Sequence, residues 1–340
     1  MPSKALDYIT IQGFKSIASI GRLALKPINV LIGANGSGKS NFLDVFRLLQ
    51  AIGEGRLRQY VGIAGGAEKI LHFGSRTTAE IEIELLFSEG TVQYEAGLSP
   101  TAEDGLFLIE TTGSAADRSG PLPWIHAQLA GWRVYHLHDT SPMHKTASVD
   151  DNRFLRPDGS NLPAFLYYLR ERHTDSYSLI RGTIQSAAPF FGDFVVEPLR
   201  INPNTVKLEW KHKISGQYFG ASSLSDGTLR LIALATLFLQ PVSHRPPTIL
   251  VDEPELGLHP YAIGLLASLI RQASVDSQVI VSTQSSILLD YFQPSEVLVA
   301  DRVDGGTRLT RLDPAPLAQW LEEYSLGQLW EKNELGGRPV

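Results

Sequence analysis

The sequence predicts an α/β protein with a mixed sheet, an antiparallel β lobe and a helical or lid-like insertion. At both ends of the chain, short apolar runs alternate with amphipathic helical patterns, as in a buried parallel sheet and its covering helices. Between residues 56 and 220 the runs alternate apolar and polar residues among Gly and Pro, which favours antiparallel strands. We expect residues 1–55 and 221–340 to form one core, and residues 56–220 to form the β lobe and lid.

The individual elements follow from the same periodicities. Apolar or alternating runs predict strands, and apolar residues on one helical face predict helices. The predicted strands are 8–11, 27–32, 79–87, 206–213, 248–251, 278–282 and a final pair at 295–300 and 307–312. The predicted helices are 41–52, 161–172, 229–239 and 261–273.

Composition excludes several classes of protein. The 340 residues are 43% hydrophobic and 19% charged, which is enough for a large core. The net charge of −6 means that any DNA contact needs a local basic patch. The absence of cysteine excludes disulfides and thiolate chemistry and fits a reducing cytoplasm. No signal peptide is apparent, and the most apolar stretch, 231–239, is about half of the ~20 residues that span a bilayer, so we expect no membrane segment.

A Gly-rich turn follows the apolar strand 27–32. Residues 33–40, GANGSGKS, fit the P-loop pattern G-x-x-x-x-G-K-[ST] at every position. Its backbone N–H groups and the following helix N-terminus would surround the phosphates, with Lys39 on the β- and γ-phosphates and Ser40 on Mg²⁺. The motif therefore predicts ATP and Mg²⁺ as ligands. The predicted nucleotide-binding residues are Gly33, Asn35, Gly36, Ser37, Gly38, Lys39, Ser40 and Asn41.

Acidic residues end the apolar strand 248–251. An Asp252 carboxylate there could hold the Mg²⁺ shell, and Glu253 could orient and deprotonate the attacking water. The alternative is a solvated corner between strand and loop. Glu255 fits either a second catalytic acid or a structural contact.

The segment LSDGT, residues 224–228, precedes a helix and then the acidic strand. It resembles the LSGGQ signature of ABC-type ATPases, in the same motif order. The resemblance implies an ABC-head-like P-loop NTPase in which Ser225 and Gly227 of one copy cap the γ-phosphate held by the other, giving a head-to-tail homodimer on ATP binding. Asp226 and Thr228 depart from the transporter consensus, and a plain helix N-cap stays open as the alternative.

In ABC proteins a histidine usually follows the strand that corresponds to residues 278–282. Here Gln284 stands in its place. A glutamine can donate to and accept from the γ-phosphate but carries no charge, so slow hydrolysis used as a switch would fit. The implied activity is an ATPase, with Lys39, Asp252, Glu253 and Gln284 as catalytic residues.

Residues 13–17, 33–41 and 252–260 together resemble the RecF/SMC-like branch of ABC ATPases. The segment YHLHDTS at residues 135–141, with residues 156–170 and 324–339, narrows the resemblance to the stand-alone members of that branch. Too few residues follow 286 for a Toprim nuclease, and no long coiled coil is visible, so we expect neither. Lys15 stands where relatives often have a basic residue near the nucleotide, or is a surface lysine. His138 or Asp139 could touch the Mg²⁺ shell, or form a polar strand end; His136 and His138 lack two further ligands for zinc.

Two functions fit these motifs. The first is an ATP-gated clamp in DNA repair, chromosome maintenance or phage defence. The second is a regulatory ATPase that controls a partner effector protein without binding DNA. A small-molecule kinase would lack the signature helix. The candidate DNA contacts are Lys207, Lys211, Lys213, Arg153, Arg156, Arg170, Arg172 and Arg181, although a solvated charged face is the alternative.

Overall fold

The structure, a computed structural model, describes residues 5–114 and 122–337, and its contacts divide the chain into two units. The first unit contains the residues up to Val134, Pro246–Leu250 and the residues from Ser277 onward. The second contains Tyr135–Arg245 and Val251–Asp276. The chain passes between the units inside β7 (Arg133–Tyr135) and β13 (Thr248–Asp252).

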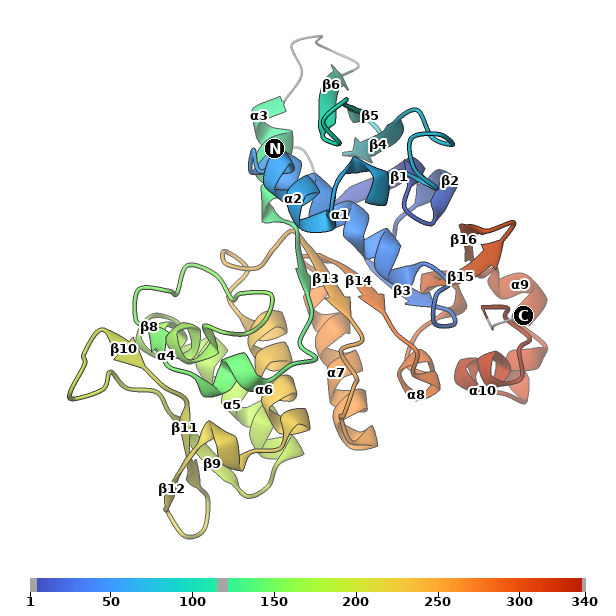
Figure 1. The fold of residues 1–340 in the computed structure, drawn as a ribbon. Coiled ribbons are helices and arrows are strands. Elements are labelled where there is room, and N and C mark those ends of the chain that lie inside the picture. The colour runs from blue at the N-terminus through green and yellow to red at the C-terminus, as the bar shows by residue number, and fades with distance from the viewer. Residues whose placement is uncertain (1–4, 115–121, 338–340) are drawn as a thin grey trace. The chain divides into compact units, whose positions relative to one another are not determined.

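Most of a six-stranded mixed sheet lies in the first unit, and β3, β13, β14, β15 and β16 are labelled in Figure 1. The strand order is β16-β15-β3-β14-β13-β7. Strand β3 pairs in parallel with β14 and β15, and β15 pairs antiparallel with β16. Every residue of β3, β13 and β14 is buried, which explains their uninterrupted apolar runs. The bounds of the remaining strands are β3 Ile28–Ile32, β14 Gln278–Ser282, β15 Val297–Val303 and β16 Gly306–Arg311.

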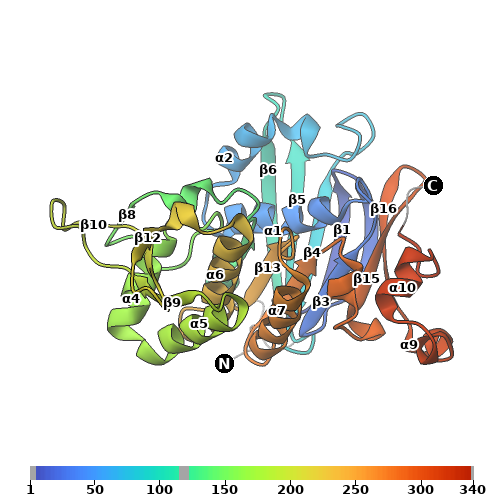
Figure 2. The same ribbon diagram turned by 90° about the horizontal axis from the view of Figure 1, so that it is seen from below.

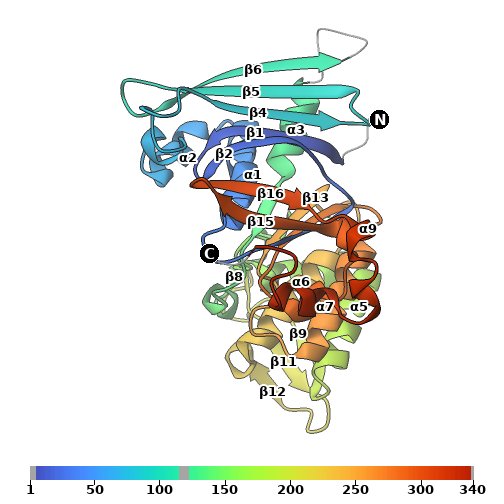
Figure 3. The same ribbon diagram turned by 90° about the vertical axis from the view of Figure 1, so that its right-hand side faces the viewer.

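The first unit also contains an antiparallel sheet in the order β2-β1-β4-β5-β6. Helices α1 and α3 lie along one of its faces (Figure 3). The two sheets confirm the predicted α/β class with a mixed sheet and an antiparallel β lobe. The strands are β1 Leu6–Phe14, β2 Ile17–Ala24, β4 Ile81–Phe87, β5 Val92–Pro100 and β6 Leu106–Ser114.

Helix α1 (Lys39–Gly53) carries the phosphate loop at its N-terminus and is buried along most of its length. Its apolar side chains share one core cluster with the antiparallel sheet and with Leu31, Leu250 and Ile280 of the mixed sheet. Packing on both sides therefore fixes the axis of α1 and the direction in which its N-terminus points. The other helices of this unit are α2 Leu57–Ala64, α3 Leu122–Gly131, α8 Ser286–Leu289, α9 Pro314–Leu317 and α10 Leu326–Glu331.

Helices dominate the second unit, where α5, α6 and α7 lie side by side (Figure 2). All residues of α6 from Leu229 to Leu239 are buried, so its apolar run is a core helix. No helix among the described residues is long and apolar enough to cross a membrane. The helices are α4 Leu162–Arg172, α5 Thr174–Ala187, α6 Asp226–Leu239 and α7 Pro260–Ala273; the strands are β8 Ala147–Ser148, β9 Phe191–Val195, β10 Thr205–Val206, β11 Glu209–His212 and β12 Tyr218–Gly220.

Two of the differences between the predicted elements and the structure have a clear physical reason. The strand 206–213 is two strands, because β10 pairs with β8 whereas β11 pairs with β9 and β12. Apolar and polar residues continue to alternate through the link between β10 and β11, so the sequence pattern does not show that the two strands have different pairing partners. Helix α6 begins at Asp226, earlier than the predicted residue 229, because Ser225 caps it. The division at residues 55 and 220 stays a prediction.

The rings of Tyr168, His173 and His244 form a cluster near the end of α4. This cluster should make the stability of the second unit depend on pH. The Tyr168 hydroxyl lies 3.2 Å from His173 Nε2 and 3.1 Å from His244 Nε2. Burial, and then the charge of His173, hold the pKa of His244 below its ordinary value. His244 therefore binds fewer protons in the folded protein than in the unfolded chain. Its contribution to the free energy of unfolding is fully present above a pH of ~6.5 and is lost as the pH falls below that value.

We expect the unfolding temperature to fall between pH ~7.5 and ~5.5, and His244→Gln to reduce the fall because it removes the titrating group. Thermal unfolding followed by circular dichroism measures both. His144 is exposed, so His144→Gln serves as the matched control. Its unfolding temperature should fall by as much as that of the wild type. An unchanged fall in His244→Gln would contradict the assignment.

Candidate nucleotide-binding site

The phosphate loop has a backbone that only glycines adopt easily. Gly36 and Gly38 have φ angles of 80° and 104°, in the left-handed region. Gly38 is the N-cap of α1, and a Cβ on it would overlap the Thr307 side chain. The loop is therefore a cradle of backbone groups at a helix N-terminus, an arrangement that binds phosphate.

Lys39 lies inside this cradle and is 5% exposed. Its ammonium donates to the carbonyl oxygens of Gly33 at 2.6 Å and Ala34 at 3.1 Å. The buried Ser37 hydroxyl has no hydrogen-bond partner within the described residues, whereas Asn35 and Ser40 are exposed. The positive charge, the glycine backbone and the accessible Ser40 hydroxyl fit the phosphates and the cation of Mg–ATP.

Long-range hydrogen bonds brace the loop. The Thr307 hydroxyl, from β16, donates to the Ser37 carbonyl at 3.0 Å and lies 2.7 Å from the Ser16 hydroxyl. The Asn41 amide donates to the Ser16 hydroxyl at 2.6 Å. Asn41, which the sequence assigns to the nucleotide, therefore also ties α1 to the turn after β1. No local sequence pattern identifies Thr307, because its role depends on a contact between distant parts of the chain.

Lys15 faces α1. It has a φ of 47°, and its ammonium lies 2.7 Å from Asp44, which also pairs with Arg47. Lys15 and Asn41 border the same open depression. The structure thus places Lys15 in the unit of the phosphate loop with its charge paired to Asp44, and its contact with a nucleotide stays a prediction.

Gln284 follows β14, the parallel neighbour of β3. The Thr283 N–H donates to the Leu31 carbonyl at 2.9 Å, which continues the pairing of the two strands past the end of β14. Because parallel strands end at the same edge, the half-buried Gln284 and the phosphate loop leave the sheet at one edge of the first unit.

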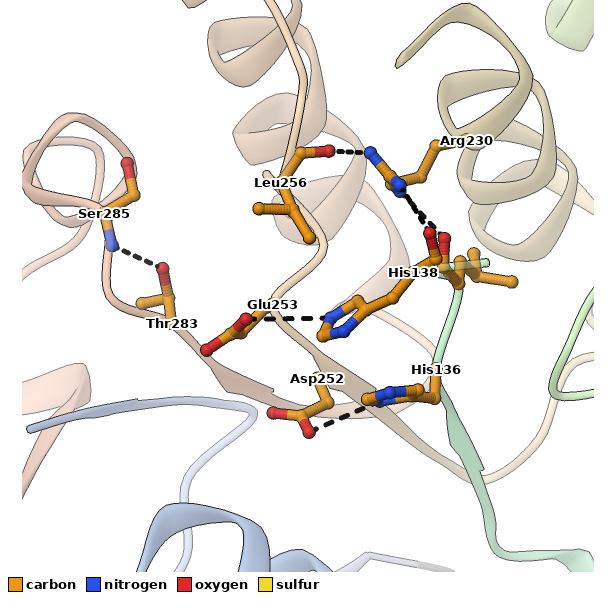
Figure 4. A network of polar contacts seen from close by, with 9 residues as sticks. His136, His138, Arg230, Asp252, Glu253, Leu256, Thr283 and Ser285 are labelled. Carbon is orange, nitrogen blue, oxygen red and sulfur yellow. Dashed lines mark hydrogen bonds and ion pairs between the residues drawn. The ribbon is translucent and has the colours of Figure 1, made fainter. Parts of the chain in front are cut away.

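The acidic residues belong to the second unit, where two histidines face them (Figure 4). His136 Nδ1 lies 3.5 Å from Asp252 Oδ2, and His138 Nε2 lies 3.7 Å from Glu253 Oε2. The two imidazole centroids are 3.9 Å apart. Glu253 has a φ of 44°, an uncommon conformation for a non-glycine residue that recurs at functional sites.

Of the two candidates in the segment YHLHDTS, His138 is the one whose side chain approaches an acidic residue, with its Nε2 3.7 Å from Glu253 Oε2. The Asp139 carboxylate accepts from the N–H and the hydroxyl of Ser141, both at 2.9 Å. These hydrogen bonds hold the pKa of Asp139 below its usual range. Asp139 thus stabilises the local turn. Its contact with a Mg²⁺ shell stays a prediction, as does that of His138.

Ser225 is the N-cap of α6, and its hydroxyl accepts from the Thr228 N–H at 3.2 Å. A Cβ on Gly227 would overlap the Gly257 carbonyl, so the first turn of α6 touches the loop that follows the acidic pair. Ser225, Gly227 and Thr228 line a cavity of about 140 Å³. Asp226 accepts from the Thr140 hydroxyl. Ser225 therefore caps α6, and its contact with a phosphate stays a prediction.

Arg230 is a residue that the sequence analysis missed. It is 4% exposed, and it donates to the carbonyl oxygens of Leu137 at 2.8 Å, His138 at 2.9 Å and Leu256 (Figure 4). The one signal was an arginine inside an otherwise apolar helical run, which needs polar partners when buried.

The fold and the phosphate loop define a P-loop ATPase domain, with no long coiled coil in the described residues. Residues 28–290 match the protein family described as "AAA domain, putative AbiEii toxin, Type IV TA system", and the chain belongs to this family.

Solved structures with this fold include heads of SMC proteins. An Smc head bound to the C-terminal winged-helix domain of ScpA has a TM-score of 0.68 and 19% identity, covering 92% of this chain and 99% of that one. An Smc head bound to the C-terminal domain of ScpA, from Pyrococcus furiosus, has a TM-score of 0.61 and 18% identity, covering 95% and 99%. At these identities the likeness concerns the fold.

Two curated sequences match over shorter stretches. Urease accessory protein 2 of Cryptococcus neoformans is 33% identical over 116 residues, which are 32% of this chain and 8% of that protein. The chromosome partition protein Smc of Desulfitobacterium hafniense is 38% identical over 90 residues, 25% of this chain and 7% of that protein. The matched stretches span less than a tenth of the length of these curated relatives.

Proposed function

We propose that this protein binds and hydrolyses ATP with Mg²⁺ and that two copies close head-to-tail around the nucleotide, as a switch. The observation that carries the proposal is the phosphate loop. A buried lysine and left-handed glycines stand at the N-terminus of a helix that packing holds in place. Backbone N–H groups and Lys39 would bind the β- and γ-phosphates.

The assignment of Asp252 and Glu253 to the same nucleotide rests on the motif order of ABC ATPases. Mg²⁺, when bound, would neutralise phosphate charge, with Ser40 and Asp252 as its protein ligands. Glu253 would orient a water and take its proton, and Gln284 would hydrogen-bond the γ-phosphate. Because Gln284 stays neutral, we propose slow turnover.

The signature segment supports a second copy as the closing partner. Ser225 is exposed at the start of a buried helix, so a phosphate from outside the molecule could reach its side chain at the positive end of that helix. In the proposed dimer, Lys39 of one copy and Ser225 of the other complete each site. A site that lacks either of these two residues could then not hydrolyse ATP.

Mixing two inactive variants tests this arrangement. Lys39→Ala disables one half of each site and Ser225→Arg the other, so each variant alone should lose hydrolysis. In a mixed dimer one site carries both changes and the other carries neither. Random pairing would leave about a quarter of the sites intact, so phosphate release should return to roughly that share of the wild-type rate. No recovery from two folded variants would refute the trans arrangement.

For the output of the switch we propose control of a partner protein. Four of the candidate DNA contacts are paired with acids, at 2.9 Å for Arg156–Asp151, 3.1 Å for Arg170–Glu171, 3.1 Å for Arg181–Asp193 and 2.8 Å for Lys207–Glu209. Such pairing leaves less charge for a phosphate backbone. A DNA clamp in repair, chromosome maintenance or phage defence is the rival output. Hydrolysis stimulated by duplex DNA would favour it, together with a DNA-binding constant whose logarithm falls with log salt by ~0.9 per phosphate contact.

A further inference from the structure

Beyond the proposed roles of the sequence motifs, we infer that Arg230 is a positioning residue. It holds His138 against Glu253 and ties that contact to the start of the signature helix. The inference rests on the proposed function for the role of Glu253 in hydrolysis. All the contacts that carry it lie within the second unit.

The guanidinium holds both sides of the contact between His138 and Glu253. It donates to the carbonyl of His138 itself and to that of Leu137. On the other side it donates to Leu256, whose N–H in turn donates to the Glu253 carbonyl at 3.3 Å. A change in the position of Arg230 would therefore move the imidazole, the carboxylate or both.

Asp226 provides a second link from the same helix. It accepts from the Thr140 hydroxyl, and it precedes Arg230 by four residues, so both side chains lie on one face of α6. Together they attach residues 137–140 to the first two turns of the helix. The helix in turn begins at Ser225, the residue proposed to meet the partner's nucleotide.

The start of α6 packs tightly against the loop that follows the acidic pair. Gly227 touches the Gly257 carbonyl, and a Cβ on Gly257 would lie 2.7 Å from the Arg230 guanidinium. A displacement of the helix start is therefore passed on to the loop rather than absorbed by a gap.

Packing alone does not account for an arginine here. Within the described residues no carboxylate lies within ion-pair distance of Arg230, and its charge is compensated by three peptide carbonyls and by the more distant charge of Asp226. Burying a charge is costly unless its hydrogen bonds are satisfied, and an apolar side chain would fill the same space at less cost. An arginine is needed because it donates to two separate loops. One loop carries His138 and the other follows Glu253, so the two loops flank the contact between these residues.

A double-mutant cycle tests whether Arg230 acts through His138. Arg230→Lys keeps the charge but cannot reach both loops, and we expect kcat to fall about tenfold with the Kd for ATP within about twofold of the wild type. His138→Ala should lower kcat similarly. The double variant should be no slower than the slower single variant, because both remove the same contact.

The matched control is Arg245→Lys. Arg245 is also a buried arginine of the second unit, but it donates to the Gln240 carbonyl at 3.0 Å and pairs with Asp276. Its effect should add to that of His138→Ala. If Arg230→Lys instead lowers kcat equally in the wild-type and His138→Ala backgrounds, Arg230 is structural only and the inference fails. Should Arg230→Lys not fold, Thr140→Val removes the second link and is tested in the same cycle.

A readout without ATP separates this inference from the proposed function. The side-chain NMR signals of His138 in the nucleotide-free protein should shift in Arg230→Lys, whereas those of the exposed His144 should not. Unshifted His138 signals would overturn the positioning role even if ATP is hydrolysed. A wild-type protein that hydrolyses no ATP would refute the proposed function, while shifted His138 signals would still support the link.

Discussion

Replacing Glu253 with glutamine is expected to lower ATP hydrolysis by about 10²- to 10⁴-fold while ATP still binds, because the amide cannot take a proton from water. The two side chains have nearly the same shape, so the turn at Glu253 with its φ of 44° should persist. Phosphate release measures the rate, and a sizing column with saturating ATP and Mg²⁺ measures the assembly. We expect a long-lived dimer, because closure would no longer be followed by hydrolysis.

Glu255→Gln is the companion variant. Glu255 is buried two residues further along, and its alternatives from the sequence were a second catalytic acid or a structural contact. We expect it to retain most of the hydrolysis. Wild-type turnover in Glu253→Gln would remove the assigned base, and an ATP-saturated variant that remains monomeric would remove the basis for closure by a second copy.

Replacing Lys39 with alanine is expected to weaken ATP binding by roughly 10- to 100-fold, since a hydrogen bond to a charged group contributes about 1.5–3 kcal/mol. The ammonium donates to the carbonyls of Gly33 and Ala34, so its loss also leaves the Gly33 carbonyl without this donor, whereas the Ala34 carbonyl still accepts from the Ser37 N–H at 3.2 Å. Calorimetric titration with a non-hydrolysable ATP analogue gives the Kd directly.

The exposed Lys145→Ala controls for the loss of one positive charge, and it should bind as the wild type does. Thermal unfolding of Lys39→Ala shows whether the loop variant is still folded. A folded Lys39→Ala protein with wild-type affinity would mean that the cradle does not hold the triphosphate.

The parts of the site that the sequence predicts are those whose chemistry is local. Phosphate binding requires glycines and a lysine at fixed spacing between a buried strand and a helix, and β3 and α1 stand where that pattern requires. The capping role of Ser225 is local in the same way. These elements follow from a few consecutive residues and their backbone requirements.

The rest depends on contacts between residues far apart in the chain. Thr307 reaches Ser37 and Ser16 from β16, and Arg230 reaches Leu137 and Leu256 from α6, so the local sequence does not identify the partners of either residue. The strand predicted at 206–213 was wrong for a related reason: pairing partners decide where a strand ends, and they lie elsewhere in the sequence.

The burial of α1 has a kinetic consequence. A helix with apolar neighbours on both sides cannot turn or slide without opening the core, so the loop at its start needs no ordering when a ligand arrives. Nucleotide capture should then be a single fast step that pays little conformational entropy. Any slow phase after mixing would belong to the assembly of two chains, and its rate should rise with protein concentration.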